Sequence, residues 1–318
     1  MTYLLLLIGF ALLIKGADYF VEGSSKIAAL LKVPPILVGL TIVAFGTSSP
    51  EATVSIIAAM EGNADVAVGN VIGSNIFNIT FVVGITALLN PLKVENTTLQ
   101  KEIPFTFLAS VALFVLMGDM VLQNAEFNAI TRTEGIILLL FFSVFMYYIL
   151  EAARNNRNST VQEEEVIIEK KWGKYILLTV GGLAAIIFGG DLVVNNSIKI
   201  AYSFGMSETL VGLTIVAVGT SLPELVTSIT AAIKKQSEIA LGNIVGSNIF
   251  NILFVLGAAS VISPLPVDGK MFLDVILMLL LTILLFVFSR TKFQIAKSEG
   301  IILAVAYIVY MVFIIMRG

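Results

Sequence analysis

Two glutamates, Glu51 and Glu224, occupy the same place in two nearly identical motifs, GTSSPE and GTSLPE, and apolar sequence surrounds both. Between Ile36–Glu51 and Thr209–Glu224, 13 of 16 positions are identical at a constant offset of 173 residues. An ionised carboxylate within a membrane is costly, so an acid in such a position indicates a functional site. Neither motif offers a basic partner. We therefore predict that the two carboxylates face each other inside a membrane and bind a cation.

The residues in front of each glutamate predict a break in the helix that carries it. Gly46 permits unusual backbone angles, and proline suits the first turn of a helix because it has no N–H to donate. We expect the helix to break near Phe45 and to restart at Pro50, with Glu51 in the new first turn, where the helix dipole favours a carboxylate. Such a break frees main-chain carbonyls that can bind cations. The carbonyls expected to be freed are those of Ala44, Gly46 and Thr47, and those of Ala217, Gly219 and Thr220 in the second copy.

A second motif follows each glutamate, reading GNVIGSNIFNI in the first copy and GNIVGSNIFNI in the second. Asn70, Ser74 and Asn78 recur every four residues and form one polar stripe on a helix. The equivalent residues of the second copy are Asn243, Ser247 and Asn251. Hydroxyls, amide oxygens and carboxylates make an all-oxygen site, which hard cations such as Ca²⁺ prefer. Two carboxylates balance either one divalent ion or a pair of monovalent ions, so the sequence predicts competition between these classes.

The composition is that of a protein that crosses a membrane many times. Of the 318 residues, 58% are hydrophobic and 13% are charged, whereas soluble domains carry about 25% charged residues. The mean hydropathy is +0.98. The chain has no Cys and no His, which excludes thiolate chemistry and histidine-based proton transfer or metal binding. We place ten apolar spans, at residues 2–21, 35–60, 66–89, 103–122, 135–150, 175–194, 208–233, 239–262, 272–288 and 300–316.

The repeat divides the chain into two halves, residues 1–150 and 175–318, joined by a short charged linker, residues 151–174. The offset between equivalent residues is 173 through most of each half and 165 near its end. Each half holds five spans, and this odd number places the second half upside down relative to the first, as in transporters built from inverted repeats. The predicted fold class is therefore an all-α membrane protein with ten transmembrane helices in two inverted five-helix repeats, in which helices 2 and 7 are broken.

Lys and Arg are distributed unequally between the two predicted sides of the membrane. With the N-terminus outside, fourteen of the nineteen fall on the side of the linker and four on the other side. Short cytoplasmic loops carry the excess of positive charge in membrane proteins. We therefore predict a multi-pass protein of the cell membrane with a cytoplasmic linker and with extracellular N- and C-termini.

The paired motifs, GTSSPE with GNVIGSNIFNI and GTSLPE with GNIVGSNIFNI, resemble the two α-repeats of the cation/calcium exchanger superfamily, and specifically those of its sodium/calcium exchanger branch. The resemblance covers all ten spans. It implies an antiporter in the lipid bilayer that exchanges Na⁺ for Ca²⁺ by alternating access, with no cofactor, nucleic acid or protein partner. The metal ligands that it implies are Thr47, Ser48, Glu51, Ser74, Asn78, Thr220, Ser221, Glu224, Ser247 and Asn251, with the carbonyls of Ala44 and Ala217 as additions.

Two departures from other members bear on the counter-ion. Potassium-dependent members usually carry Asp where this chain has Asn251, and proton/calcium exchangers usually have a His beside the acid, which this chain lacks. These two departures favour Na⁺/Ca²⁺ exchange over exchange of Ca²⁺ for H⁺ or participation of K⁺; a cation channel is a further alternative. Eukaryotic exchangers insert calcium-sensing domains where this chain has only its linker, so we expect no regulation of that kind. An enzyme is disfavoured because no nucleophile and base are suitably spaced. The pairs Gly16-Ala17 and Gly189-Gly190 suggest that spans 1 and 6 slide across the site-bearing core.

Overall fold

The structure, a computed structural model, describes residues 2–122, 125–159, 171–205 and 217–317, which are helical apart from loops and four two-residue strands. The helices of the first half, with π-helical segments labelled η, are α1 Thr2–Leu31, α2 Pro35–Val38, η1 Gly39–Val43, α3 Ala44–Thr47, α4 Ser49–Met60, α5 Ala64–Phe77, η2 Asn78–Val82, α6 Val83–Leu89, η3 Thr98–Glu102, α7 Ile103–Leu116, α8 Asp119–Leu122 and α9 Arg132–Ser159. Those of the second half are α10 Trp172–Ser203, α12 Ala217–Gly219, α13 Leu222–Ile233, α14 Ser237–Ile249, η6 Phe250–Leu256, α15 Gly257–Ile262, α16 Gly269–Arg290 and α17 Lys297–Arg317. The strands are β1 Leu92–Lys93, β2 Ala129–Ile130, β3 Leu265–Pro266 and β4 Gln294–Ile295.

Eight helical stretches of the described chain are long and apolar enough to cross a membrane. The pair Pro35–Thr47 and Ser49–Met60, bent by 49° at its break, makes a ninth span if it is counted as one. The shorter apolar helix α13 carries the second acidic motif. Residues 206–216, which precede it in the predicted span 208–233, lie outside the described residues. The predicted all-helical membrane fold and the break in its second span are therefore confirmed.

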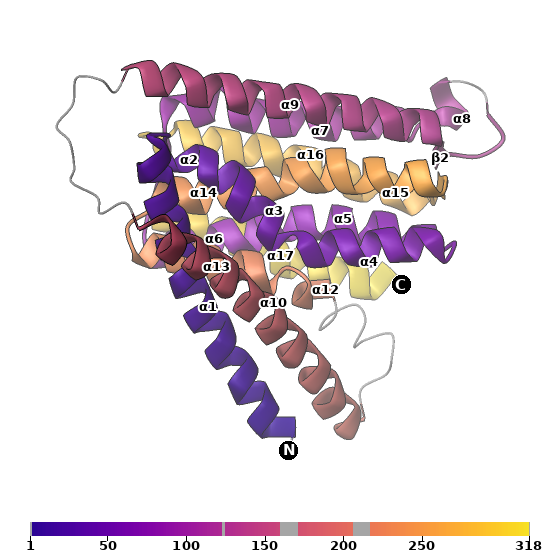
Figure 1. Cartoon of the computed structure of the whole chain (residues 1–318). Coiled ribbons are helices and arrows are strands. Elements are labelled where there is room, and N and C mark those ends of the chain that lie inside the picture. Colours follow the sequence, from indigo (N-terminus) through magenta and orange to yellow (C-terminus); the bar gives the residue numbers. More distant parts are fainter. Residues whose placement is uncertain (1, 123–124, 160–170, 206–216, 318) are drawn as a thin grey trace.

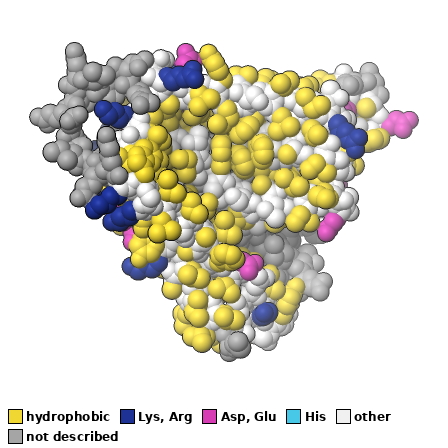
Figure 2. Space-filling model, viewed as in Figure 1, with side chains coloured by type: hydrophobic (Ala, Val, Ile, Leu, Met, Phe, Trp, Pro, Cys, Tyr) yellow, Lys and Arg dark blue, Asp and Glu magenta, His cyan; other side chains and the backbone are white. Residues whose placement is uncertain are grey.

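Most helices run side by side in one bundle, with α7 and α9 along one face of it (Figure 1). Helices α1 and α10 pack against each other and cross the bundle at a steep angle on the opposite side (Figure 1). Hydrophobic side chains cover the middle of the face seen in Figure 2, and Lys and Arg gather mostly where α1 meets α2. We call this end the lysine end and define it by Lys32, Lys93, Lys235 and Lys292, the last three of which line one cavity.

Two long helices form the centre of the bundle. They are Ala64–Leu89, made of α5, η2 and α6, and Ser237–Ile262, made of α14, η6 and α15. Buried residues make up 78% and 83% of their apolar windows, against 17–39% for the other long spans. A helix enclosed on all sides can hold polar groups away from lipid. The fold thus places the polar stripes that begin at Asn70 and Asn243 inside protein.

Glycines bring α1 and α10 into close contact. A Cβ atom added at Gly9 would lie 2.9 Å from the carbonyl oxygen of Gly189, and one at Gly16 would lie 2.8 Å from that of Gly182. Such distances leave no room for any side chain, and glycine-lined contacts of this kind let membrane helices approach closely. The two helices are therefore packed as one tight antiparallel pair.

The two halves are also joined at both ends of the bundle. Strand β1 pairs antiparallel with β4 at the lysine end, and β2 pairs antiparallel with β3.

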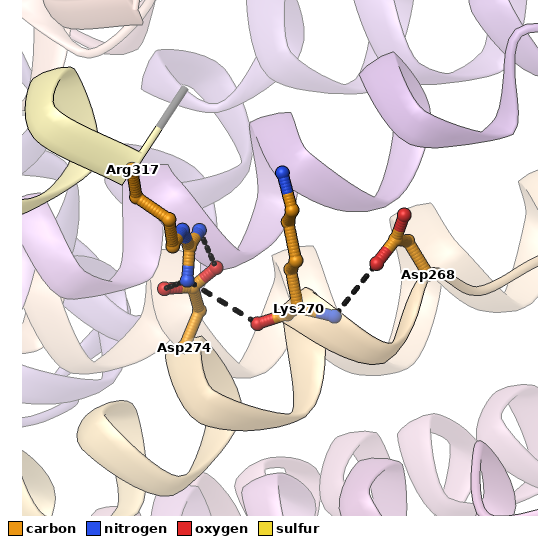
Figure 3. A network of polar contacts seen from close by, with 4 residues as sticks. All are labelled: Asp268, Lys270, Asp274 and Arg317. Carbon is orange, nitrogen blue, oxygen red and sulfur yellow. Dashed lines mark hydrogen bonds and ion pairs between the residues drawn. The ribbon is translucent and has the colours of Figure 1, made fainter.

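Near the end of α17, Arg317 donates to both carboxylate oxygens of Asp274, at 3.1 and 2.7 Å, and to the carbonyl oxygen of Lys270 (Figure 3). Asp268 caps α16 by accepting from the N–H of Lys270 (Figure 3). These contacts connect the last two long helices.

Several helices are longer or shorter than their apolar sequence indicates. Helix α1 runs to Leu31, ten residues beyond its predicted end, and α9 and α10 extend into the predicted linker at both sides. The fourth span ends at Leu116, because the chain turns at Met117 before the separate short helix α8. Hydropathy marks the part of a helix that lies in lipid, whereas hydrogen bonds and capping decide where the helix ends. Residues 160–170 of the predicted linker lie outside the described residues.

Candidate ion-binding site

The break in the second span lies at Ser48. Helix α3 ends at Thr47, Ser48 has φ −83° and ψ 9°, and α4 begins at Ser49 with Pro50 in its first turn. The break therefore lies between Phe45 and Pro50, where it was predicted, but three residues after Phe45. Gly46 is helical, and its missing side chain serves packing instead, since an added Cβ would meet Leu183 and Phe20 at 3.0–3.2 Å.

The carbonyls before the break are mostly engaged by hydrogen bonds. The carbonyl oxygen of Ala44 accepts from the N–H of Ser48 at 2.9 Å, and that of Gly46 accepts from the Ser49 hydroxyl at 2.8 Å. The prediction that the break frees these two carbonyls is therefore wrong. Ala44 keeps a main-chain donor, and for Gly46 the hydroxyl of Ser49 replaces a lost helical donor. In the second copy the break falls at the equivalent Ser221, with φ −90° and ψ 9°.

Three π-helical segments surround the site and were not predicted. They are η1 in the broken span and η2 and η6 in the two central helices. Asn78 is the first residue of η2, and Asn251 is the second residue of η6. A π-helical turn holds one more residue than an α-helical turn, and such segments are frequent at functional sites. Periodicity at 3.6 residues contains no signal for them.

The two glutamates are buried at the centre of the molecule and are held crosswise. Ser221 of the second half donates to Oε1 of Glu51 at 2.8 Å, and Ser48 of the first half donates to Oε1 of Glu224 at 2.7 Å. Both carboxylates have 0% exposure, and each accepts from a serine of the opposite half. The structure thus brings the two acids to one buried contact between the halves.

Two further serines lie beside the carboxylates. Ser74 Oγ is 3.5 Å from Oε1 of Glu51 and 3.1 Å from Ser221 Oγ. Its equivalent, Ser247, lies within hydrogen-bonding reach of Glu224, and its Oγ is 3.5 Å from the carbonyl oxygen of Ala44. Both serines are buried, so the structure brings these two predicted ligands to the site.

The two threonines contact asparagines of the opposite half. Thr47 donates to Oδ1 of Asn243 at 2.9 Å, and Thr220 donates to Oδ1 of Asn70 at 3.4 Å. Each asparagine in turn donates to a serine one turn beyond a glutamate, Asn70 to Ser55 at 3.0 Å. Asn243 makes the equivalent contact with Ser228 at 2.9 Å. In this structure the threonine hydroxyls therefore brace the broken helices through asparagines of the opposite half, and Thr47 also lies within hydrogen-bonding reach of Glu224.

The two remaining predicted ligands, Asn78 and Asn251, contact a pair of asparagines that the sequence analysis did not single out. Asn78 donates to Oδ1 of Asn248, and Asn251 donates to Oδ1 of Asn75, both at 3.2 Å. Asn75 and Asn248 lie off the four-residue stripe, which is why periodicity missed them. Their signal in the sequence is that each stands, buried, next to a stripe serine in an otherwise apolar GSNIF segment.

Four buried oxygens of these residues have no hydrogen-bond partner. They are Oε2 of Glu51 and Glu224 and Oδ1 of Asn78 and Asn251. A buried acceptor without a partner costs about 1–3 kcal/mol, and each half contributes two of these four oxygens. Oxygen ligands with two negative charges suit a hard divalent cation. No cluster of three or more acids occurs among the described residues, so amides and hydroxyls must complete any coordination shell.

A hollow of about 570 Å³ approaches the site from the end opposite the lysine end. Its lining includes Leu6 of α1, Ser197 and Phe204 of α10, and Gly219 and Leu222, which flank the second break. The neighbouring residue, Ser221, donates to Glu51. The hollow therefore reaches from the α1–α10 pair to the second break, next to a serine of the site.

Comparison with known proteins gives one consistent family. The family model described as sodium/calcium exchanger protein matches residues 1–151 and 174–316. The chain is 39% identical to the putative antiporter CaxA of Alkalimonas amylolytica, over 96% of this chain and 95% of that protein. It is 36% identical to the sodium/calcium exchanger MaX1 of Methanosarcina acetivorans, over 98% of this chain and 97% of that one. Both matches span nearly the whole length of each protein.

The fold is also similar to a solved one. A structure of the sodium-calcium exchanger NCX_Mj, soaked with 2.5 mM Na⁺ and 10 mM Sr²⁺, superposes with a TM-score of 0.84 at 30% sequence identity. The match covers 98% of this chain and 99% of that one. The described helices and that structure therefore share one membrane fold.

Proposed function

Because the chain belongs to the sodium/calcium exchanger family, whose members are cation/Ca²⁺ antiporters and not enzymes, we propose that it exchanges Na⁺ for Ca²⁺ across the cell membrane by alternating access. The ions bind at the membrane midplane between two inverted five-helix repeats. The observation that carries this proposal is the crosswise site, in which each half supplies one buried carboxylate oxygen and one buried amide oxygen without a partner.

The ion ligands follow from this geometry. Ca²⁺ binds to the free oxygens of Glu51, Glu224, Asn78 and Asn251, and the hydroxyls of Ser48, Ser221, Ser74 and Ser247 turn towards it when it is bound. Thr47 and Thr220 hold the broken helices in place and supply further oxygens for Na⁺. Two carboxylates neutralise one Ca²⁺. Na⁺ ions that bind to the same oxygens therefore displace the Ca²⁺ ion.

Pairs of equivalent contacts support ten spans in two inverted repeats. Gly84 and Gly300 approach each other so closely that a Cβ on either would lie 2.7 Å from the other's carbonyl oxygen, and their equivalents, Gly257 and Gly135, make the corresponding contact. The pairing of β1 with β4 is likewise equivalent to the pairing of β3 with β2. A twofold relation in the membrane plane produces such exchanged pairs. The tenth span is then the predicted 208–233.

Alternating access occurs by sliding of the α1–α10 pair over the core. The glycine contacts make this pair one tight unit, and the pair lies at a steep angle to the helices of the bundle (Figure 1). Both helices line the hollow, and sliding would close it and open a path at the lysine end. A cysteine cross-link from α1 to α13 that left flux intact would contradict this motion.

The lysine end faces the cytoplasm, and both termini lie outside the cell. The support is the excess of Lys and Arg at that end (Figure 2). The chain has no Cys, so single cysteines are clean reporters of sidedness. A cysteine at Lys235 should react with a membrane-impermeant maleimide only in inverted vesicles, and one at Thr2 only in right-side-out cells.

The decisive test is ⁴⁵Ca²⁺ uptake into proteoliposomes with imposed ion gradients. We expect uptake to require an outward Na⁺ gradient and to be unaffected by removal of K⁺. Uptake that follows a pH gradient without Na⁺ would instead establish Ca²⁺/H⁺ exchange, and uptake that needs K⁺ together with Na⁺ would establish K⁺ participation. Ca²⁺ current without any counter-ion would establish a channel.

A further inference from the structure

An asparagine is an ambiguous cation ligand, because its side chain presents either an oxygen or an NH₂ group. At this site Asn78 and Asn251 both turn their NH₂ groups away, towards the opposite half, at 3.2 Å from Oδ1 of Asn248 and Asn75. Their own Oδ1 atoms are the ones left without a partner. Something must hold both amides in this orientation, because a rotation of 180° would point two N–H bonds at the cation.

The orientation of Asn75 is fixed by the main chain. Its Nδ2 donates to the carbonyl oxygen of Asn248 at 3.2 Å, and a main-chain carbonyl can only accept. The Oδ1 atom of Asn75 must therefore face the other way, where it can accept only a donor. Asn251 meets this requirement with its Nδ2. A chain of two hydrogen bonds thus runs from the backbone of α14 through Asn75 to Asn251.

We propose that Asn75 and Asn248 are positioning residues, which orient the amides of Asn251 and Asn78 so that oxygen and not NH₂ faces the transported cation. This proposal rests on the proposed function and adds the device that makes an uncharged side chain a reliable ligand. Neither positioning residue is itself a ligand, because its Oδ1 is occupied by the NH₂ group of the opposite half.

The cost of these two side chains supports a role beyond packing. Asn75 is 0% exposed and Asn248 is 1% exposed, among apolar neighbours such as Ile76 and Ile249. Burial of an amide costs desolvation that its hydrogen bonds only offset, so aliphatic side chains of the same shape can replace both partners at little or no cost in stability. A purely structural contact between the central helices could therefore use leucine at both positions.

The test is a double-mutant cycle on Ca²⁺ affinity, measured as the Ca²⁺ concentration for half-maximal Na⁺-driven ⁴⁵Ca²⁺ uptake. Asn75→Leu removes the acceptor for Asn251, and we expect this concentration to rise about tenfold, as for loss of one charge-assisted ligand. Asp has two equivalent oxygens and needs no orientation. In an Asn251→Asp background, Asn75→Leu should therefore change the half-maximal concentration less than about twofold.

An equal loss in both backgrounds would overturn the proposal, because it would assign Asn75 a structural role only. Asn248→Leu with Asn78→Asp forms an independent second cycle with the same expectation, so failure of one variant to fold leaves the other. Ile76→Ala is the matched control for damage to the core, and its effect should be the same with Asn251 and with Asp at that position. Absence of Ca²⁺ uptake in the wild-type protein would contradict the proposed function instead.

Discussion

At the centre of the molecule the two halves make the same contacts with each other, whereas at the two ends of the bundle equivalent positions carry different residues. Ser48 and Ser221 exchange hydrogen bonds with the glutamates of the opposite half at 2.7 and 2.8 Å. The amides of Asn78 and Asn251 do the same with their asparagine partners, both at 3.2 Å. The cation site therefore depends on both halves equally, and differences between the halves must serve something else.

One difference concerns the turns that end helices. At the lysine end, Lys32 and Lys235 adopt positive φ angles of 57° and 60°. Their equivalents, Gly205 and Gly62, also have positive φ, at 80° and 77°. Glycine takes this conformation without strain, whereas a lysine in it lowers the stability of the fold by about 1 kcal/mol. The comparison indicates that the placement of positive charge on one side of the membrane outweighs the local preference of the backbone.

A second difference concerns the link between the sliding pair and the core. At the lysine end, Lys234, the residue after α13, forms an ion pair with Asp18 of α1 at 2.6 Å, and Gln236 donates to Ser25 at 3.0 Å. The positions equivalent to Asp18 and Lys234 are Asp191 and Glu61, two acids. The lysine end therefore has an ion pair between Lys234 and Asp18, which we call the latch, and the equivalent residues at the other end cannot form one.

The largest expected effect tests the equality of the two halves at the centre. Glu51→Gln and Glu224→Gln should each reduce Na⁺-driven ⁴⁵Ca²⁺ uptake more than about a hundredfold, since each removes one of two charges from a buried site. Glu102→Gln is the control, because Glu102 is a buried acid that accepts from Tyr148 away from the site. Full transport by either site variant would show that the halves are not equivalent.

The next effect tests the latch. Lys234→Ala should shift the chain towards the state open at the lysine end by about two- to fivefold, the range of a partly exposed ion pair. The measurement is the reaction rate of a single cysteine at Ser197, which lines the hollow at the opposite end, with an impermeant maleimide; the rate should fall. The charge swap Asp18→Lys with Lys234→Asp should restore it. An unchanged rate in Lys234→Ala would leave the ion pair without a role in the conformational equilibrium.

A smaller effect tests the helix-ending turns. Gly62→Lys should lower the free energy of unfolding by about 1 kcal/mol, and Lys235→Gly should raise it by about 0.5 kcal/mol. The space around Gly62 is open, so the backbone angle alone decides its effect. Thermal unfolding in detergent measures both variants. Equal stabilities for Gly62→Lys and wild type would remove the backbone explanation.

The smallest effect concerns the clamp of the last helix. Asp274 and Arg317 join α16 to α17 (Figure 3), whereas the equivalents of these residues in the first half are Lys101 and Ala152. Arg317→Met should lower the free energy of unfolding by about 0.5 kcal/mol, as for a partly exposed pair. A double-mutant cycle with Asp274→Asn isolates the pair, and a coupling of zero would show that the clamp does not stabilise the fold.

The sequence was sufficient for the membrane class, most spans and the pairing of the two acids, because hydropathy and an internal repeat report on these directly. It was insufficient for the backbone details. Gly46 resembled a hinge because glycine permits unusual angles, but it is helical and packs closely against Leu183 and Phe20. The π-helical segments escaped detection because no local residue pattern marks them.

The asparagines show a second limit of pattern reading. Asn78 and Asn251 were found because they lie on a four-residue stripe, whereas Asn75 and Asn248 were missed because they point across to the other half. Thr47 and Thr220 were predicted as ligands from the family resemblance, and their contacts with Asn243 and Asn70 arise only from the packing of distant segments. Contacts between the halves depend on the tertiary fold, so the periodicity of the sequence does not predict them.

The most direct test of the account is an anomalous diffraction map from crystals soaked in Sr²⁺, which substitutes for Ca²⁺. The account predicts one strong peak within about 3 Å of the free oxygens of Glu51, Glu224, Asn78 and Asn251 together. A peak that contacts only one of the two glutamates, or a peak elsewhere with none between them, would contradict it.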